Sequence, residues 1–277
     1  MDIINAESYD VTTLLGSQLG LSSLLPVSFP VSRQFTMNQW LNVFPLEEFN
    51  TLPKLRYFGV GIRGAYNADD EIRRNAYNPS RLNMNLYTPI PIRCRPIDED
   101  LTDAERANYR LRVRRTMNDG NEYFLYYLKV LEFDNAINFK RINPTTGNEE
   151  LYELSPEYLE PTPVKVATNT TIDTSENTVV AYCNARVYVE ASEILEYIRV
   201  AYEGDVRYAN ISEIGFFTGI DKEVSGVTGQ NVGISYLESI YTMLYNHATW
   251  MGSSLSHDGQ YIDATFEITS LGSIVAL

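Results

Sequence analysis

The sequence contains few of the residues from which most catalytic sites are built. It has two cysteines and two histidines in 277 residues. Two cysteines do not make a disulfide framework, and neither Cys94 nor Cys183 lies in a metal-ligand spacing. We therefore expect both to be reduced, small side chains on β-strands, and we expect neither a cofactor nor a metal.

Long apolar runs are also absent. No stretch of 18 consecutive apolar residues occurs, and residues 1–7 lack the basic start and apolar run of a secretory signal. The net charge of −14 argues against general nucleic-acid binding and against an anionic membrane surface, because both need an excess of Lys and Arg. We expect a protein that folds in a reducing cytosol without a membrane partner.

Basic residues are missing from both ends of the chain. No Lys or Arg precedes Arg33, and the 55 residues after Lys222 hold five acids and no base. Because Lys and Arg usually occupy free surfaces, these ends predict segments that lie against the core or against a neighbouring subunit, and we favour a subunit. The apolar candidates for such a contact are Leu14, Leu15, Leu21 and Leu25 near one end and Ile274, Val275 and Leu277 at the other.

What the sequence does contain is mainly strand and turn signals. They predict an α+β fold that is mainly antiparallel β, with a meander or sandwich-like core, a few short helices and extended N- and C-terminal arms. We divide the chain into an N-terminal arm and connector (1–53), a β-rich core (54–222) and a base-free C-terminal segment (223–277). That last segment is expected to pack on the core or on a neighbour.

Hairpins provide the clearest local signals. Residues 109–114 alternate strictly, and the turn Asn118-Asp119-Gly120-Asn121 leads into a return strand at 122–133. A second hairpin joins 137–142 to 150–154. Three further expectations are a strand at 54–63, an edge strand at 86–97 that contains three prolines, and a strand at 178–190. Residues 65–84 and 155–177 are expected to be loops.

Helix signals are fewer. Residues 101–106 are expected to open one helical turn, with Thr102 as the cap and Glu105 completing a capping box. The best predicted helix spans 191–203, with Gly204 at its C-terminal cap. Residues 8–25 suggest a short or broken helical arm because Gly16 and Gly20 interrupt it. Residues 35–43 suggest a short helix, and 226–233 a glycine-rich, mobile or partner-bound loop. Residues 235–250 fit both helix and strand. We favour a helix there, with pairing to 260–274 as the alternative.

Five arginines cluster between residues 106 and 115 of this acidic chain. On the predicted strand, Arg110, Arg112 and Arg114 share one face. This face is either solvated or a subunit contact, since guanidinium groups bind carboxylates in a bidentate manner. The acidic C-terminal segment of a neighbouring copy would be its complement. A role for these arginines in lining a nucleic-acid channel is the less favoured alternative.

Few residues could support catalysis. A pairing of Cys183 with His247 or His257 is conceivable, but no family signature surrounds Cys183. Residues Gly59, Gly61 and Gly64 match G-x-G-x-x-G, yet no helix and no suitably placed acid follow, so we interpret the match as accidental. We therefore expect no enzyme activity.

Two segments resemble structural proteins of tailed-bacteriophage particles. They are Phe35-Thr-Met-Asn-Gln-Trp-Leu41 with its continuation Pro45 to Phe58, and Ala209-Asn-Ile-Ser-Glu-Ile-Gly-Phe-Phe-Thr-Gly-Ile-Asp221. The resemblance implies a virion component of the neck, collar, tail or baseplate, synthesised in the host cytoplasm and built as an oligomeric ring. Its expected partners are copies of itself and other virion proteins.

Two other functions remain open. One is a receptor- or glycan-binding module at a tail tip, since 20 tyrosines provide rings that can stack on sugars, although they also suit β-strands and subunit contacts. The other is a Cys- or carboxylate-dependent hydrolase.

Overall fold

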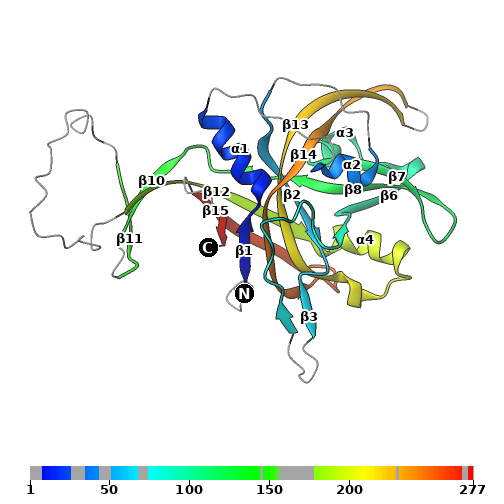
Figure 1. Ribbon diagram of the computed structural model, residues 1–277. Coiled ribbons are helices and arrows are strands. Elements are labelled where there is room, and N and C mark those ends of the chain that lie inside the picture. The colour runs from blue at the N-terminus through cyan, green and yellow to red at the C-terminus, as the bar shows by residue number, and fades with distance from the viewer. Residues whose placement is uncertain are drawn as a thin grey trace, which may run out of the picture.

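The computed structural model describes residues 8–25, 35–43, 51–67, 74–143, 146–153, 155, 178–228, 231–269 and 274–276. Antiparallel sheets dominate it, and the helices are short. The predicted class, α+β and mainly antiparallel β, is confirmed. Figure 1 shows two sheets packed face to face, with helices at their margins and several hairpins that project from the packed sheets.

The first sheet has the strand order β1-β14-β13-β2-β8-β6, with β5 paired to β2 and β7 paired to β8. Every pairing in it is antiparallel. Its strands are β1 (Tyr9–Thr12), β2 (Lys54–Gly61), β5 (Pro89–Ile90), β6 (Arg93–Pro96), β7 (Tyr109–Thr116), β8 (Glu122–Val130), β13 (Asn210–Thr228) and β14 (Asn231–Ser254).

The second sheet has the order β11-β10-β12-β15-β16, with β9 paired to β12. Its strands are β9 (Glu132–Phe133), β10 (Asn138–Ile142), β11 (Glu149–Leu151), β12 (Thr178–Glu190), β15 (Tyr261–Thr269) and β16 (Ile274–Ala276). A separate hairpin joins β3 (Ala65–Asn67) to β4 (Arg74–Ala76). It occupies part of the stretch expected to be loop at 65–84.

The main core lies between the two sheets and is closed at one side by helix α4 (Ala191–Ala201). α4 buries Ile194 and Ile198, and Gly204 follows it with a φ of +80°, a conformation that glycine adopts without strain. The predicted helix and its cap are therefore confirmed. A second cluster covers the opposite face of the first sheet and includes Met37 and Leu41 of α2 (Met37–Leu41).

The remaining helices are α1 (Leu14–Leu24) and α3 (Asp103–Arg106), and 3₁₀ turns occur at Ile97–Glu99 and Val206–Ala209. Thr102 and Glu105 form the capping box predicted for α3. α1 is continuous through Gly16 and Gly20 rather than broken. Gly16 lies against β14, where a Cβ would be 2.4 Å from the Tyr245 carbonyl oxygen.

The helix expected at 235–250 is wrong, because these residues lie in the middle of β14. Two cores cover β14, one on each face, so Leu244 and Trp250 are both buried, in different clusters. Register shifts against β13 disturb the alternation further. A strand buried on both faces loses the period of two, and its apolar residues then imitate helical spacing.

The alternative pairing of 260–274 with this segment is also wrong, because β15 pairs with β12 and β16. The C-terminal segment thus contributes strands to both sheets and packs on the chain's own core. Residues 226–228 and 231–233, expected to be loop, belong to β13 and β14. Apart from Ser155, the loop expected at 155–177 lies outside the described residues.

Candidate functional site

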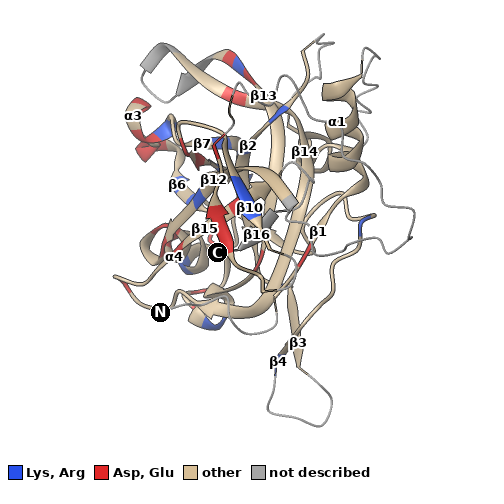
Figure 2. Cartoon of the chain, turned by 90° about the vertical axis from the view of Figure 1, so that its left-hand side faces the viewer, with Lys and Arg blue, Asp and Glu red and all other residues tan. Residues whose placement is uncertain are grey.

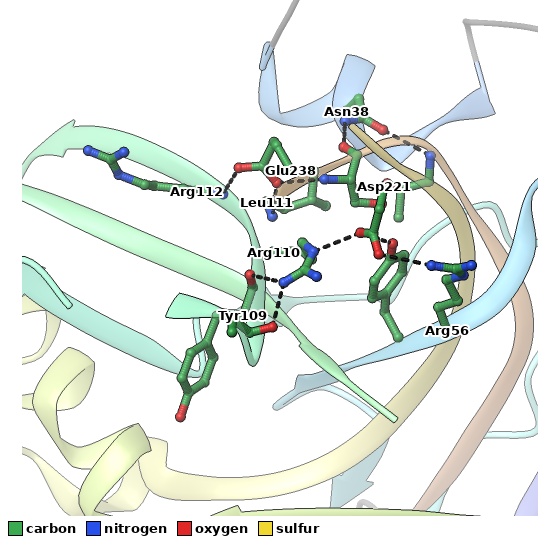
Figure 3. A network of polar contacts seen from close by, with 12 residues as sticks. Asn38, Arg56, Tyr109, Arg110, Leu111, Arg112, Asp221 and Glu238 are labelled. Carbon is green, nitrogen blue, oxygen red and sulfur yellow. Dashed lines mark hydrogen bonds and ion pairs between the residues drawn. The ribbon is translucent and has the colours of Figure 1, made fainter. Parts of the chain in front are cut away.

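A network of buried charges lies where the long β13–β14 hairpin crosses β7 (Figure 3). Asp221 of β13 is its centre. Arg110 Nε donates to Asp221 Oδ1 over 2.8 Å, the Tyr57 hydroxyl donates to the same oxygen over 2.6 Å, and Arg56 Nη1 donates to Oδ2 over 2.9 Å. Burial alone would raise the pKa of Asp221, but the hydrogen bonds from Arg110 and Tyr57 hold it below its usual range. Asp221 is therefore a carboxylate fixed on three donors.

Glu238, on β14, provides a second contact between the hairpin and β7. Its carboxylate accepts hydrogen bonds from the backbone N–H groups of Leu111, Arg112 and Ser239. Leu111 has a φ of +52°, which is rare for a leucine. Glu238 accepts the hydrogen bonds of the backbone N–H groups at this unusual position. Complete burial raises the pKa of Glu238. The carboxyl group holds the backbone of β7 against the hairpin.

Two further arginines complete the network. Arg106 and Arg112 both contact Asp100 Oδ2, at 2.9 Å and 3.3 Å. Their guanidinium groups lie over the ring of Tyr236, at 5.2 Å and 5.3 Å from its centroid. Such contacts are attractive because the ring face is negative. Tyr236 lies two residues before Glu238 on β14. The contacts of Arg106 and Arg112 with its ring therefore also hold β14 against α3 and β7.

This arrangement changes the interpretation of the arginine stripe. Arg110 is buried and Arg112 nearly so, and both pair with acids of the same chain. Of the three arginines predicted to form a subunit contact, only Arg114 is largely exposed, and it pairs with Glu122. The face that sequence alternation assigned to solvent or to a neighbour is covered by the chain's own hairpin.

The predicted acidic complement is also used within the chain. Of the five acids after Lys222, Glu238 binds the β7 backbone, Asp263 pairs with Arg186, and Glu267 pairs with Lys140 at 2.7 Å. Glu223 and Asp258 remain exposed. Glu238 and Glu267 are buried, so two of the five acids are unavailable to a neighbouring copy, and the predicted acidic strip is not a continuous surface.

The structure does not bring Cys183 together with either histidine. Cys183 lies on β12, where its thiol contacts the backbone oxygen of Asp134 at 3.9 Å. His247 is fully buried on β14, and its Nε2 lies 3.0 Å from a carboxylate oxygen of Glu213. His257 lies in the turn before β15. Gly64 is followed by strand β3 rather than a helix, as expected for an accidental glycine motif.

The Glu213–His247 pair is a feature that sequence reasoning missed. Glu213 also accepts hydrogen bonds from the backbone N–H groups of Tyr87 and Thr88, and Asn83 contacts His247 Nδ1 at 2.9 Å. The pair thus connects β13 and β14 to residues 83–88. No local pattern marks it, because its members are 34 residues apart in sequence.

Within the described part of the chain, no group of three or more His, Cys, Asp or Glu side chains is placed to bind a metal ion. No helix among these residues is both long and apolar enough to cross a membrane.

Of the predicted leucines of the N-terminal arm, Leu14, Leu15 and Leu21 lie on α1, and Leu25 is its C-terminal cap residue. The inner side of α1 buries Gly16, Leu19 and Ser22 against β14. Its outer side carries exposed leucines, and Leu15 is half-buried between the two sides. The exposed fractions are 51% for Leu14, 60% for Leu21, 80% for Leu24 and 51% for Leu25. Leu24 was not among the predicted residues, although its helical spacing from Leu21 could have indicated it.

The candidates at the other end are placed differently. Ile274 and Val275 lie in β16, whose backbone pairs with β15. Leu277 lies outside the described residues. This end of the described chain is therefore paired within the second sheet instead of extending as an arm.

A row of partly exposed tyrosines was also missed. Ring centroids of Tyr66 and Tyr77 are 4.7 Å apart, those of Tyr77 and Tyr87 are 5.8 Å apart, and Tyr87 packs on His247 at 4.9 Å. The row runs from the β3–β4 hairpin to the buried Glu213–His247 pair. The three tyrosines lie within 21 positions of one another in the sequence. Their spacing does not predict ring contacts, which arise only when the fold brings the rings together.

No curated protein and no solved structure is similar enough to this chain to count as a match. A family of unknown function, DUF7208, matches residues 2–273. That match covers every described helix and strand except β16, and the chain therefore belongs to the DUF7208 family.

Proposed function

We propose that this protein is a non-enzymatic structural subunit of a tailed-phage virion. It assembles with copies of itself, and with other virion proteins, into a ring of the neck, collar, tail or baseplate. The observation that carries the proposal is α1, a helix that is apolar on the side facing its own chain and on the side facing outward.

An uncharged helix that carries leucines on its outer side as well as on its inner side is normally covered on both sides. The segment from Leu14 to Leu25 contains no charged residue, as Figure 2 also shows for α1. Leu14 and Leu21 are seven residues apart, a spacing that places two helical side chains on the same side, and the exposed Leu25 follows directly at the C-terminal cap. Four exposed leucines within 12 residues are an unusual concentration of exposed apolar side chains, of the kind that marks a protein contact.

α1 is also held rigidly in place. The Thr13 backbone N–H donates to the Tyr245 carbonyl oxygen over 2.9 Å, and its hydroxyl donates to the Leu244 carbonyl oxygen over 2.6 Å. The same hydroxyl caps the helix by accepting from the Gly16 N–H. A surface that needs no ordering on association loses less conformational entropy when it binds. This rigidity favours a permanent contact over a transient one.

The shape of the molecule supports assembly. The β3–β4 hairpin and the outer parts of β10–β11 and β13–β14 extend from the body in Figure 1. Extensions of this kind suit subunits that contact neighbours through unlike surfaces, the geometry that closes into rings. The resemblance of segments 35–58 and 209–221 to phage structural proteins supports the virion assignment.

The test is the oligomeric state of the full chain, measured by light scattering during size-exclusion chromatography and by electron microscopy. We expect a discrete ring. The double substitution Leu21→Asp/Leu24→Asp should give a monomer with an unchanged unfolding midpoint, because the replaced side chains are exposed in the subunit. Ser23→Asp adds charge to the same helix at an exposed position away from the leucine stripe and should leave the ring intact. A wild-type chain that stays monomeric at high concentration would refute the proposal.

The tyrosine row favours a second candidate, a glycan-binding module at a tail tip. Tyr66, Tyr77 and Tyr87 present aromatic rings at the surface, and aromatic rings can stack on sugars. A glycan array probed with the full chain would show binding that Tyr77→Ala reduces at least tenfold. An array without any bound glycan would dismiss this candidate and leave the ring proposal unaffected.

A further inference from the structure

The outer part of the β13–β14 hairpin has an open edge on β14. Residues 221–225 of β13 pair with residues 235–239 of β14 without a register shift. Ser239 shows which backbone groups in this stretch face away from β13. Its N–H donates to the Glu238 carboxylate, and its carbonyl oxygen accepts from Asn38 Nδ2 over 2.7 Å (Figure 3). Both backbone groups of Ser239 therefore point to the side of β14 that is opposite β13.

The same orientation recurs two and four residues earlier. In an antiparallel pair, every second residue turns both its N–H and its C=O away from the partner strand. Leu237 and Ser235 therefore also face away from β13. No backbone hydrogen bond that joins described residues outside the strand pairings involves either of them. Asn38 and Glu238 thus close the edge at Ser239, and the edge is open at Leu237 and Ser235, where a further strand could pair.

A pocket of about 190 Å³ lies along this open edge. Residues 235–237 of β14 line it, together with Glu223 of β13 and with Asp103 and Arg106 of α3. The Glu238 carboxylate joins the same side of β14 to β7, which follows α3 in the chain. A strand added to a sheet lies about 4.8 Å from its neighbour. It would therefore run through the pocket between β14 and α3.

The charges around the pocket favour a basic side chain on the added strand. Asp103 and Glu223 are both exposed, one on α3 and one on β13. Arg106, the base in the lining, is already paired with Asp100 at 2.9 Å. Complementary charge selects partners and like charge rejects them. A lysine or arginine between the two exposed carboxylates is therefore preferred over an acid.

Arg106 also has donors that the described chain does not use. Its side chain is 4% exposed, and its Nε and Nη1 atoms are buried without an acceptor among the described residues. Buried donors without an acceptor are rare because they cost free energy. A peptide strand in the pocket brings carbonyl oxygens, which are the acceptors that Arg106 lacks. The pocket thus offers acceptors for a cationic side chain and donors for a peptide backbone.

We propose that the open edge of β14, at Ser235 and Leu237, binds an extended segment of another protein. This segment carries a lysine or arginine that Asp103 and Glu223 hold. Main-chain hydrogen bonds give such a contact its affinity, and side-chain pockets give it specificity. The net charge of −14 disfavours a second copy of this acidic chain as the source of a basic segment. The contact does not involve α1, so its failure would leave the ring proposal unaffected.

A peptide with one lysine between strand-forming residues tests the site. The probe is fluorescein-labelled acetyl-Thr-Val-Thr-Lys-Thr-Val-Thr-amide, titrated with the full-length protein and followed by fluorescence anisotropy. The same peptide with glutamate in place of lysine should bind at least tenfold more weakly. Asp103→Asn/Glu223→Gln should weaken binding of the lysine peptide at least tenfold. Asp98→Asn/Glu99→Gln removes the same charge from exposed residues outside the pocket and should change binding less than threefold.

Methylation of the peptide backbone distinguishes strand pairing from charge attraction. In an added strand, only alternate N–H groups face β14. A peptide methylated on both valine nitrogens and one methylated on the two threonine nitrogens that flank the lysine should therefore differ at least tenfold in affinity. Equal affinities of these two peptides would overturn the proposal. So would a lysine peptide that does not bind, or that binds Asp103→Asn/Glu223→Gln as well as the wild type.

The variant Leu21→Asp/Leu24→Asp shows whether a neighbouring copy occupies the edge instead. This variant and the wild type should bind the lysine peptide equally, because the edge of β14 is open in both. Binding seen only in the variant would show that a neighbouring copy fills the edge in the assembled ring. That result would overturn the assignment of the edge to another protein.

Discussion

Strand β7 and helix α1 differ in how their side chains meet solvent. β7 carries four arginines, yet Arg110 and Arg112 are turned inward and paired with Asp221 and Asp100. α1 carries no charge, yet its leucines are turned outward. In β7 the chain supplies a partner for each buried charge, whereas the described chain supplies no cover for the outer side of α1. The comparison teaches that a cluster of charges in the sequence does not by itself mark a free surface, because the chain can fold its own acids onto it.

Among the substitutions that test this comparison, Arg110→Ala should cause the largest loss in the free energy of unfolding. Removing the guanidinium leaves the half-buried Asp221 carboxylate with one fewer charged donor, and breaking a buried pair from one side is strongly destabilising. Because Arg56 and Tyr57 remain, we expect a loss at the low end of that range, about 3 kcal/mol in the free energy of unfolding. Denaturant unfolding of the full chain provides the measurement.

Arg114→Ala is the matched control, since Arg114 lies four residues further along β7 on the same face and is largely exposed. Its unfolding midpoint should equal that of the wild type, because exposed ion pairs contribute little. Equal losses in both variants would contradict the division of β7 into a buried and an exposed part.

Two glycines of α1 should give smaller effects of opposite sign. A Cβ at Gly16 meets the Tyr245 carbonyl oxygen at 2.4 Å, whereas a Cβ at Gly20 meets no atom within 4 Å. We expect Gly16→Ala to lower the free energy of unfolding by about 2 kcal/mol and Gly20→Ala to raise it by about 0.5 to 1 kcal/mol. Unfolding curves of both variants would check this. A stabilising Gly16→Ala would mean that α1 does not pack closely on β14.

The smallest expected effect is on the pH dependence of stability. The contact between Glu238 and β7 should contribute to it, whereas α1 should not. Burial raises the pKa of Glu238 above its usual 4.5. The stability that this group contributes is therefore fully present below the unfolded pKa and is lost as the pH rises through the folded pKa. Glutamine does not titrate, so the stability of Glu238→Gln relative to wild type should increase as the pH rises from about 4 to 8.

Denaturant unfolding at several pH values would measure the difference in the free energy of unfolding between the wild type and Glu238→Gln. The contributions of all other carboxyl groups are the same in both chains and cancel in this difference. A difference that stays constant, or that falls as the pH rises, would show that the hydrogen bonds from Leu111, Arg112 and Ser239 outweigh burial. The oligomeric state over the same pH range should not change, since α1 contains no titratable side chain.

Local signals were sufficient for much of the fold. The β7–β8 hairpin, the α3 capping box and α4 with Gly204 were predicted because a few neighbouring residues specify each of them. Strand β12 was predicted because its alternation survives where one face is less buried than the other. The outer leucines were predicted in part, since uncharged apolar residues at helical spacing are visible in the sequence.

The remaining features depend on contacts between distant residues. Asp221 meets Arg110 across 111 residues, and Glu238 meets Leu111 across 127, so sequence spacing could not show that the arginine face is covered. β14 was misassigned because burial on both faces removes its alternation.

The docking of α1 on β14 also has a consequence for the order of events during synthesis. Thr13 caps α1 and hydrogen-bonds to Leu244, 231 residues later in the chain. The ribosome therefore releases the leucine helix long before the strand on which it rests. Until β14 emerges, α1 lacks the strand on which it docks. In the proposed assembly, α1 would therefore become a defined contact surface only in completed chains.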